Sequence, residues 1–170
     1  MTATYEKIAT TTLGSDTLYI DFSSISSSYT DLVLITNHFM AAQCTVGMRF
    51  NSDTGSNYSS TNLRGNGTTA SSGRISNTTA IDNSLDDIAR NPNVANAVTI
   101  WNIQNYSNST TYKTVLYRHN NATADAAGVS AGVGLWRSTS AITAIRLLAT
   151  SSTQNFKSGS TFTLYGIKVA

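Results

Sequence analysis

The segment Gly128–Gly132 reads G-V-S-A-G and matches the spacing G-x-S-x-G, in which a serine nucleophile stands on a sharp turn between a strand and a helix. Such a serine needs an acidic residue and then a histidine later in the chain. No histidine follows His119 and no acidic residue follows Asp125, so the chain after Ser130 contains neither of these partners. The flanking residues are typical of a strand rather than of a helix start. We therefore expect that Ser130 is not catalytic and that the chain is not an enzyme.

Metal and cofactor sites have no better support. The two histidines, His38 and His119, have no carboxylate or cysteine at ligand spacing, which argues against zinc. The polar residues 51–57 resemble the start of a calcium loop without its closing glutamate, and a turn whose Asn and Asp side chains bond their own backbone explains them. The segment Gly65–Ala70 fits G-x-G-x-x-A, but polar residues flank it on both sides, where a dinucleotide site needs a buried strand and a helix. We expect neither a metal nor a cofactor.

Composition indicates an all-β protein. Ser, Thr and Asn make up well over a third of the 170 residues, apolar residues 40 % and charged residues only 12 %. Threonine suits the solvated face of a strand, and Ser and Asn suit turns, while strong helix formers are scarce, with Glu6 as the single glutamate. The length is that of one domain with a proper core, so we expect a single domain over residues 1–170.

Charge and cysteine content exclude several classes of partner. The eleven Lys and Arg residues lie singly along the chain and the formal net charge is +2, without the basic cluster that nucleic-acid binding requires. No apolar run approaches the ~18 residues of a membrane span, and the N-terminus lacks a signal-peptide core. We expect a soluble protein with neither nucleic acid nor membrane as a partner. Cys44 is the single cysteine, so no internal disulfide forms, and we expect it to be buried as a small apolar side chain.

Short alternating segments between turn residues predict ten strands. They are Tyr5–Thr10, Thr17–Phe22, Asp31–His38, Cys44–Phe50, Tyr58–Arg64, Ala97–Tyr106, Tyr112–Asn120, Val129–Trp136, Ala141–Thr150 and Thr161–Val169. The continuous apolar run Leu32–Ile35 suits a strand that is covered on both faces. Because no helical segments alternate with these strands, the pattern predicts an antiparallel β-sandwich that is jelly-roll-like.

Two segments break the strand pattern. The stretch Gly65–Ser84 is a low-complexity run of Gly, Ser, Thr and Asn, and we expect a long loop there. After it, Ile81, Leu85 and Ile88 fall at i, i+4 and i+7, which predicts at most one short helix, near Ser84–Arg90. An irregular loop with a few apolar anchors is the alternative interpretation.

The most informative segments are Met48–Gly67, a strand that runs into a polar turn, and Ser160–Ala170, a final strand whose apolar residues should fill the core. The first reads MRFNSDTGSNYSSTNLRGNG and the second STFTLYGIKVA. Together with KTVLYR at Lys113–Arg118 and GLWRSTSAITAI at Gly134–Ile145, they resemble a family of small bacteriophage virion proteins. Members of that family share an RFN-D-GSNYS turn and an LYGI strand at the C-terminus.

This resemblance implies a structural protein of the phage virion, assembled in the host cytoplasm: a capsid decoration or cement protein, or a head or tail appendage. The implied partners are further copies of the chain, as a homotrimer, and other virion proteins such as the major capsid protein. The candidate assembly contacts lie in the turn and beside the long loop, and they are Asp53, Asn57, Tyr58, Arg64 and Arg74.

The alternative function is a carbohydrate-binding module, for instance the host-recognising tip of a phage fibre. Tyr58 and Trp136 are the candidate rings that would stack on a host surface glycan. The competing interpretation of both rings is burial in the core of the sandwich.

Overall fold

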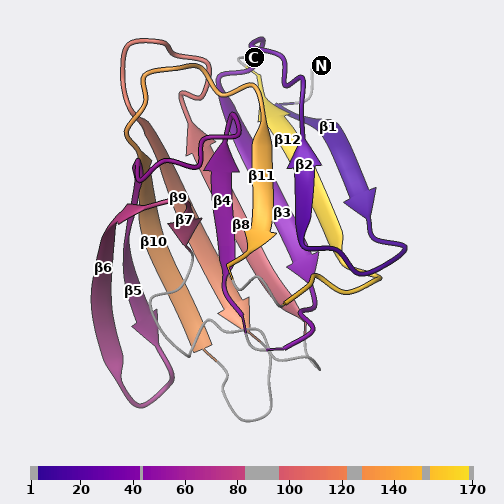
Figure 1. The fold of residues 1–170 in the computed structure, drawn as a ribbon, viewed down its shortest axis with the longest axis vertical. Helices are drawn as coiled ribbons and strands as arrows, with labels where there is room; N and C mark the ends of the chain where they lie inside the picture. The colour runs from indigo at the N-terminus through magenta and orange to yellow at the C-terminus, as the bar shows by residue number, and fades with distance from the viewer. Residues whose placement is uncertain (1–3, 43, 83–95, 122–127, 151–153, 169–170) are drawn as a thin grey trace.

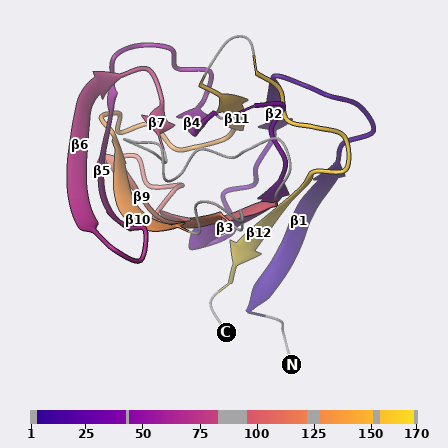
Figure 2. The ribbon, with the colours of Figure 1, turned by 90° about the horizontal axis from the view of Figure 1, so that it is seen from below.

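The computed structural model describes residues 4–42, 44–82, 96–121, 128–150 and 154–168. Within these residues the chain forms twelve strands and no helix, and the strands make two antiparallel sheets (Figure 1). Seen from below, the smaller sheet lies over the hollow side of the larger one, which curls up around it at one end (Figure 2). The predicted all-β sandwich is confirmed.

The larger sheet has eight strands in the order β1-β12-β3-β8-β9-β10-β5-β6. Every neighbouring pair is antiparallel. The bounds of the strands are β1 Tyr5–Thr12, β12 Thr161–Ile167, β3 Asp31–His38, β8 Ala97–Gln104, β9 Lys113–Asn121, β10 Gly128–Trp136, β5 Tyr58–Gly65 and β6 Ala70–Thr78.

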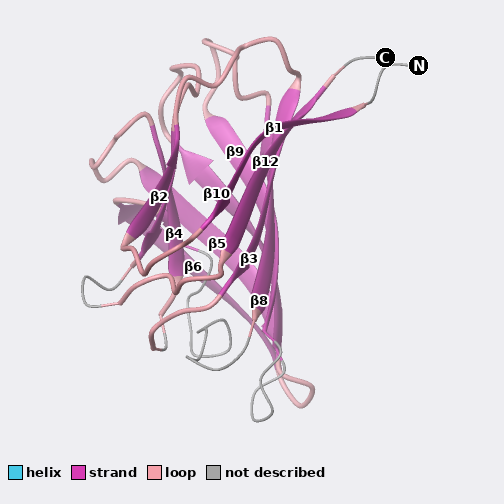
Figure 3. Cartoon of the chain, turned by 90° about the vertical axis from the view of Figure 1, so that its right-hand side faces the viewer, coloured by secondary structure: helices cyan, strands magenta, loops and turns pink. Residues whose placement is uncertain are grey.

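The smaller sheet has four strands in the order β2-β11-β4-β7, again antiparallel throughout. Their bounds are β2 Tyr19–Phe22, β11 Ile145–Ala149, β4 Val46–Phe50 and β7 Ile81–Asp82. In the side view these short strands cover one face of the larger sheet, and the opposite face of that sheet is turned away from them (Figure 3).

The connectivity is that of a jelly roll with two inserted hairpins. If β5-β6 and β9-β10 are set aside, β1-β12-β3-β8 faces β2-β11-β4-β7, and the chain crosses between the sheets at nearly every step. Eight strands in two facing sheets of this order are the jelly-roll arrangement. The inserted hairpins join the larger sheet beyond β8 and double its width, which the sequence pattern did not reveal.

The core lies between the sheets and follows the two-residue alternation of the strands. In β8 the residues from Ala97 onward alternate between buried and half-buried, and Trp101 and Ile103 are fully buried. The smaller sheet contributes Met48 and Leu147, also fully buried. Each such side chain stabilises the fold by about 1.5–3 kcal/mol relative to an exposed one. Cys44 belongs to this core, as expected.

The prediction of a long loop at Gly65–Ser84 is wrong, because most of this segment forms β6 and β7. β6 pairs with β5 along its whole length, with a tight turn around Gly67. Its burial pattern shows little core contact, since β6 is the edge strand of the sheet. The helix expected at Ser84–Arg90 lies outside the described residues.

Two apolar side chains lie elsewhere than predicted. Ile35 points away from the smaller sheet and is 36 % exposed, so the run in β3 is buried on both faces only from Leu32 to Leu34. In β12, Phe162 and Leu164 are buried as expected, whereas Ile167 is only half-buried. Val169 lies outside the described residues.

The strand predicted at Ala141–Thr150 begins only at Ile145 because a side chain replaces the sheet partner of the preceding backbone. The Oδ1 atom of Asn51 accepts hydrogen bonds from the backbone N–H groups of Thr143 at 2.8 Å and Ala144 at 3.1 Å. Its Nδ2 atom donates to the carbonyl of Ala141 at 2.7 Å. These backbone groups therefore have hydrogen-bond partners without pairing to a neighbouring strand.

Candidate functional site

A densely hydrogen-bonded turn, residues 51–57, joins β4 to β5. Asn51 and Ser52 have φ values of 50° and 60°, in the left-handed region that Asn tolerates better than most residues. The carboxylate of Asp53 then accepts from the Gly55 N–H at 2.8 Å and from Nδ2 of Asn57 at 3.0 Å. The turn predicted from the Asn and Asp side chains is therefore confirmed.

The same carboxylate reaches into the core. Nε1 of Trp136 donates to Oδ2 of Asp53 at 2.7 Å, which satisfies a buried indole. Burial would raise the pKa of Asp53, but the hydrogen bonds from Trp136, Asn57 and the Gly55 N–H outweigh it and hold the pKa below its usual value. Asp53 is thus an internal clamp between the turn and the end of β10.

Both rings proposed for sugar stacking are buried, which corrects that prediction. Tyr58 is 0 % and Trp136 2 % exposed, and the two rings stack on each other with centroids 6.2 Å apart. The hydroxyl of Tyr58 accepts from the Phe50 N–H at 3.1 Å, and burial raises the pKa of Tyr58 to about 12. A ring without an exposed face cannot stack on a glycan, so neither residue serves that purpose in this fold.

The predicted assembly contacts do not form one surface. Asp53, Asn57 and Tyr58 are brought together, but they bond to one another and to the core. Arg64 lies further along β5 and donates from Nε to Oγ of Ser71 at 2.6 Å, which ties β5 to β6. Arg74 is exposed on β6. Whether any of the five contacts a partner stays a prediction.

The sequence did not point to a second surface, the side of the larger sheet that faces away from the smaller sheet. We call this surface the outer face and define it by the outward residues of β3, β5, β8, β9 and β10. Its exposed apolar side chains are Ile35 (36 %), Leu116 (42 %), Val133 (42 %), Val129 (59 %) and Leu63 (66 %).

These residues adjoin one another across the strands. Leu116 lies opposite Val133, and Ala131 lies between Arg118 and Leu63 in one cross-strand row. All but Ile35 stand on the inserted hairpins rather than on the jelly-roll strands. A signal was present in β10, where apolar residues alternate with Ser130, Gly132 and Gly134, but alternation does not say which side faces the core.

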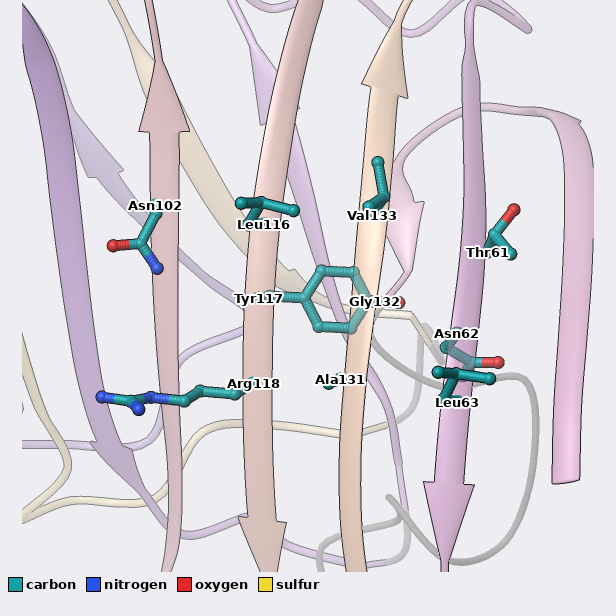
Figure 4. A pocket seen from close by; sticks show the side chains of 10 residues that line it. All are labelled: Thr61, Asn62, Leu63, Asn102, Leu116, Tyr117, Arg118, Ala131, Gly132 and Val133. Atoms are coloured by element: carbon teal, nitrogen blue, oxygen red, sulfur yellow. The ribbon is translucent and has the colours of Figure 1, made fainter. Parts of the chain in front are cut away.

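A hollow of about 750 Å³ lies on the outer face, and its lining comes from β5, β8, β9 and β10 (Figure 4). Its apolar rim includes Leu63, Leu116 and Val133. The hollow lies between these side chains because Ala131 is small and Gly132 has no side chain. Beneath Gly132 the ring of Tyr117 fills the inner side of the sheet, and its hydroxyl donates to the Asp82 carbonyl at 3.3 Å.

The outer face carries little charge. Arg118 is the single charged residue at the outward positions of β8, β9 and β10. In Figure 4 its guanidinium extends across β8, and Asn102 of β8 supplies an amide on the same side of the hollow. The arrangement offers a broad apolar contact with a few hydrogen-bond donors, which is the composition of an interface.

The inner side of the same strands holds a buried polar row. The hydroxyl of Thr99 lies 2.7 Å from Nδ1 of His119, and that of Thr36 lies 3.1 Å from Nδ1 of His38. Burial, with a contribution from His119, lowers the pKa of His38 to about 3. These histidines are structural members of the core at neutral pH.

The G-x-S-x-G segment has no elbow geometry. Ser130 lies in the middle of β10, paired with His119 on one side and Arg64 on the other, and is 2 % exposed. A strand-to-helix turn, which the serine of such an elbow needs, does not occur at this position. Among the described residues, no group of three or more His, Cys, Asp or Glu side chains is placed to hold a metal ion.

Lys113, at the start of β9, is a buried cation that the sequence did not single out. It is 1 % exposed, and its Nζ atom donates to the carbonyls of Thr111 at 2.6 Å and Thr139 at 3.1 Å. Burial lowers the pKa of Lys113. Its role is to join the two segments that contain these carbonyls.

The part of the chain that the structure describes has no helix long and apolar enough to cross a membrane. Comparison with models of protein families, with curated proteins and with solved structures gives no match.

Proposed function

We propose that this chain is a structural protein of a bacteriophage particle, a decoration or cement protein on the capsid or an appendage of the head or tail. The observation that carries the proposal is a jelly roll whose inserted hairpins present an uncovered apolar face. Jelly rolls are common among viral capsid domains. A broad apolar sheet face suits a protein that works by packing against other proteins.

The shared sequence motifs support the same proposal through the fold. The RFN-D-GSNYS turn holds β4, β5 and β10 together through Asp53, and the LYGI strand is β12, between β1 and β3. Both motifs are thus positions where the architecture depends on particular side chains. Proteins that share them are expected to share the sandwich and the work of a scaffold.

A carbohydrate-binding module is the second candidate function, since lectin domains also use the jelly roll. The hollow on the outer face combines apolar side chains with the donors Arg118 and Asn102, as a sugar site would. The stacking rings would have to be others, because Tyr58 and Trp136 are buried; Tyr19 and Tyr112 are 48 % and 55 % exposed. Binding of the folded chain to a glycan array, lost in Arg118→Ala, would favour this function.

Labelling of particles tests the proposed function. An antiserum against this chain, bound to purified particles from the source of the sequence, should place gold at regular positions on the head or at the tail. Quantitative mass spectrometry against the major capsid protein then separates the alternatives, since hundreds of copies indicate decoration and a handful indicates an appendage. Particles that contain no copies of the chain would contradict the proposal.

A further inference from the structure

The outer face is an unpartnered surface built mainly by the inserted hairpins. The smaller sheet covers the inner side of the larger sheet, whereas five apolar side chains on the outer side stay 36–66 % exposed. Leu63 and Val129 are 66 % and 59 % exposed there, so both side chains remain largely in contact with water in a single chain. Apolar side chains gathered in this way mark an interaction surface.

The projecting side chains and the hollow of the outer face have shapes that can fit together between two copies of the chain. The exposed side chains of Leu63 and Val129 flank the residues Ala131 to Val133, where the hollow of about 750 Å³ lies. A twofold axis that lies in the plane of the contact, between Leu63 and this hollow, places Leu63 of each copy over the hollow of the other. Such an isologous contact uses the same patch on both subunits, and it is the commonest arrangement of homo-oligomers.

The area of the face is sufficient for a stable pair. Five strands spaced about 4.8 Å apart, with about seven residues in each at 3.3 Å per residue, form a plane of roughly 550 Å². The accessible area is larger, because it follows the relief of the side chains, and it comes near the ~800 Å² per partner of a standard interface. Two sheets packed in this way lie about 10 Å apart.

Charge does not oppose the contact. Arg118 is the single charged outward residue on β8, β9 and β10, and it lies to one side of the hollow in Figure 4, so its guanidinium can reach the polar rim of the partner copy. Asn102 and Thr61 are available there as hydrogen-bond partners. These hydrogen-bond partners keep the charge of Arg118 from being buried unpaired.

We propose that two copies of this chain pack outer face against outer face, around a twofold axis near Ala131–Val133. This pairing does not depend on the proposed function. It is an alternative to the homotrimer expected from the sequence, which stays a prediction. Of the segments assigned to the trimer contact, β6 is an edge strand and the turn is bonded to its own core.

Light scattering after size-exclusion chromatography tests the pairing in the full chain. At tens of micromolar the wild type should have twice the 18.1 kDa mass of one chain. In the double variant Leu63→Thr/Val129→Thr, which has β-branched side chains suited to strands at both positions, the dissociation constant should rise roughly tenfold or more. Leu18→Thr is the matched control, since Leu18 is 43 % exposed outside the outer face, and its mass should stay that of the dimer.

A covalent link provides a readout that does not depend on affinity. Val133→Cys places a thiol near the proposed axis, while the native Cys44 is buried. A short bis-maleimide spans the roughly 10 Å between the sheets, which a disulfide cannot. It should link two Val133→Cys copies, whereas Leu18→Cys should stay monomeric on a denaturing gel. A monomer or a trimer by light scattering would overturn the proposal, as would a dimer that the outer-face variant leaves unchanged while its thermal unfolding remains cooperative.

Discussion

At the scale of single residues, Asp53 shows how side chains that resemble ligands are used by the fold. Its oxygens accept from a backbone N–H, an amide and a buried indole, and these donors come from the turn itself and from the end of β10. A carboxylate that makes three such bonds has little capacity left for a metal ion. The oxygen-rich spacing is explained by the turn that it builds.

Replacing Asp53 with alanine should destabilise the protein by about 2–3 kcal/mol, because Nε1 of Trp136 is then left buried without an acceptor. Urea unfolding followed by tryptophan fluorescence measures the change. Thr54→Ala is the control in the same turn, since Thr54 is exposed, and it should stay within about 0.5 kcal/mol of the wild type. Equal stability of the two variants would show that the clamp contributes nothing.

His38 should make the protein sensitive to acid. Its pKa is about 3 in the fold, where burial disfavours the charged form, and near 6.5 when the chain is unfolded. The unfolded state therefore binds the proton first, and the contribution of His38 to stability is complete above pH 6.5 and is lost as the pH falls toward 3. The free energy of unfolding should fall by up to about 1.4 kcal/mol per pH unit in this window.

Urea titrations at several pH values between 7 and 4 measure this slope. The variant His38→Gln retains an acceptor for the hydroxyl of Thr36 but has no proton to gain, so its stability should depend less on pH. A wild type and a His38→Gln variant with the same slope over this range would rule out His38 as the cause.

At the scale of elements, sequence reasoning succeeded where alternation of apolar residues is strong. β3 was predicted with its observed bounds, Asp31–His38, because its apolar residues are flanked by turn residues. β6 was missed because its residues are small and polar on both sides, with Ile75 as its single large apolar residue. An edge strand needs only the ladder to β5, and hydrogen-bond pairing leaves no mark in the sequence.

The same limit explains what was missed at the candidate site. β10 was predicted, but its register was not, and register alone decides that Val129 and Val133 face outward while Trp136 faces the core. Tyr58 and Trp136 were weighed as surface rings because nothing local shows that they stack on each other. Contacts between residues far apart in the chain determined both outcomes.

Gly134 controls how β7 of the smaller sheet approaches β10. A Cβ atom at this position would lie under 3.0 Å from three carbon atoms of the Ile81 side chain, which is fully buried. Gly134→Ala should therefore destabilise the protein by about 1–3 kcal/mol through overpacking. Ile81→Val relieves part of the clash, so the double variant should lose less than the sum of the single changes. Additive losses in thermal unfolding would show that the two side chains do not interact.

At the scale of the whole molecule, the two ends of the chain meet in one sheet. β12 lies between β1 and β3, so the larger sheet is complete only when the last strand is in place. The inserted hairpins extend this sheet on its other side. Their outer face carries four of the nine large apolar side chains that are exposed among the described residues. The pairing that we propose thus uses the inserted hairpins rather than the jelly-roll strands β1 and β12.

A chain that ends at Ser160 should accordingly fail to fold as a cooperative unit. The loss of β12 leaves backbone N–H and C=O groups of β1 and β3 without their hydrogen-bond partners. It also removes Phe162 and Leu164, which are both fully buried. Truncation of either side chain alone costs about 2–5 kcal/mol. A peptide of residues 161–168 added in trans can pair with both strands, and it should restore the β circular dichroism and a cooperative thermal transition. The same peptide with Phe162 and Leu164 replaced by serine is the control, because it keeps the ladder and lacks the core contacts. A truncated chain that unfolds cooperatively without any peptide would show that the jelly roll does not need its last strand.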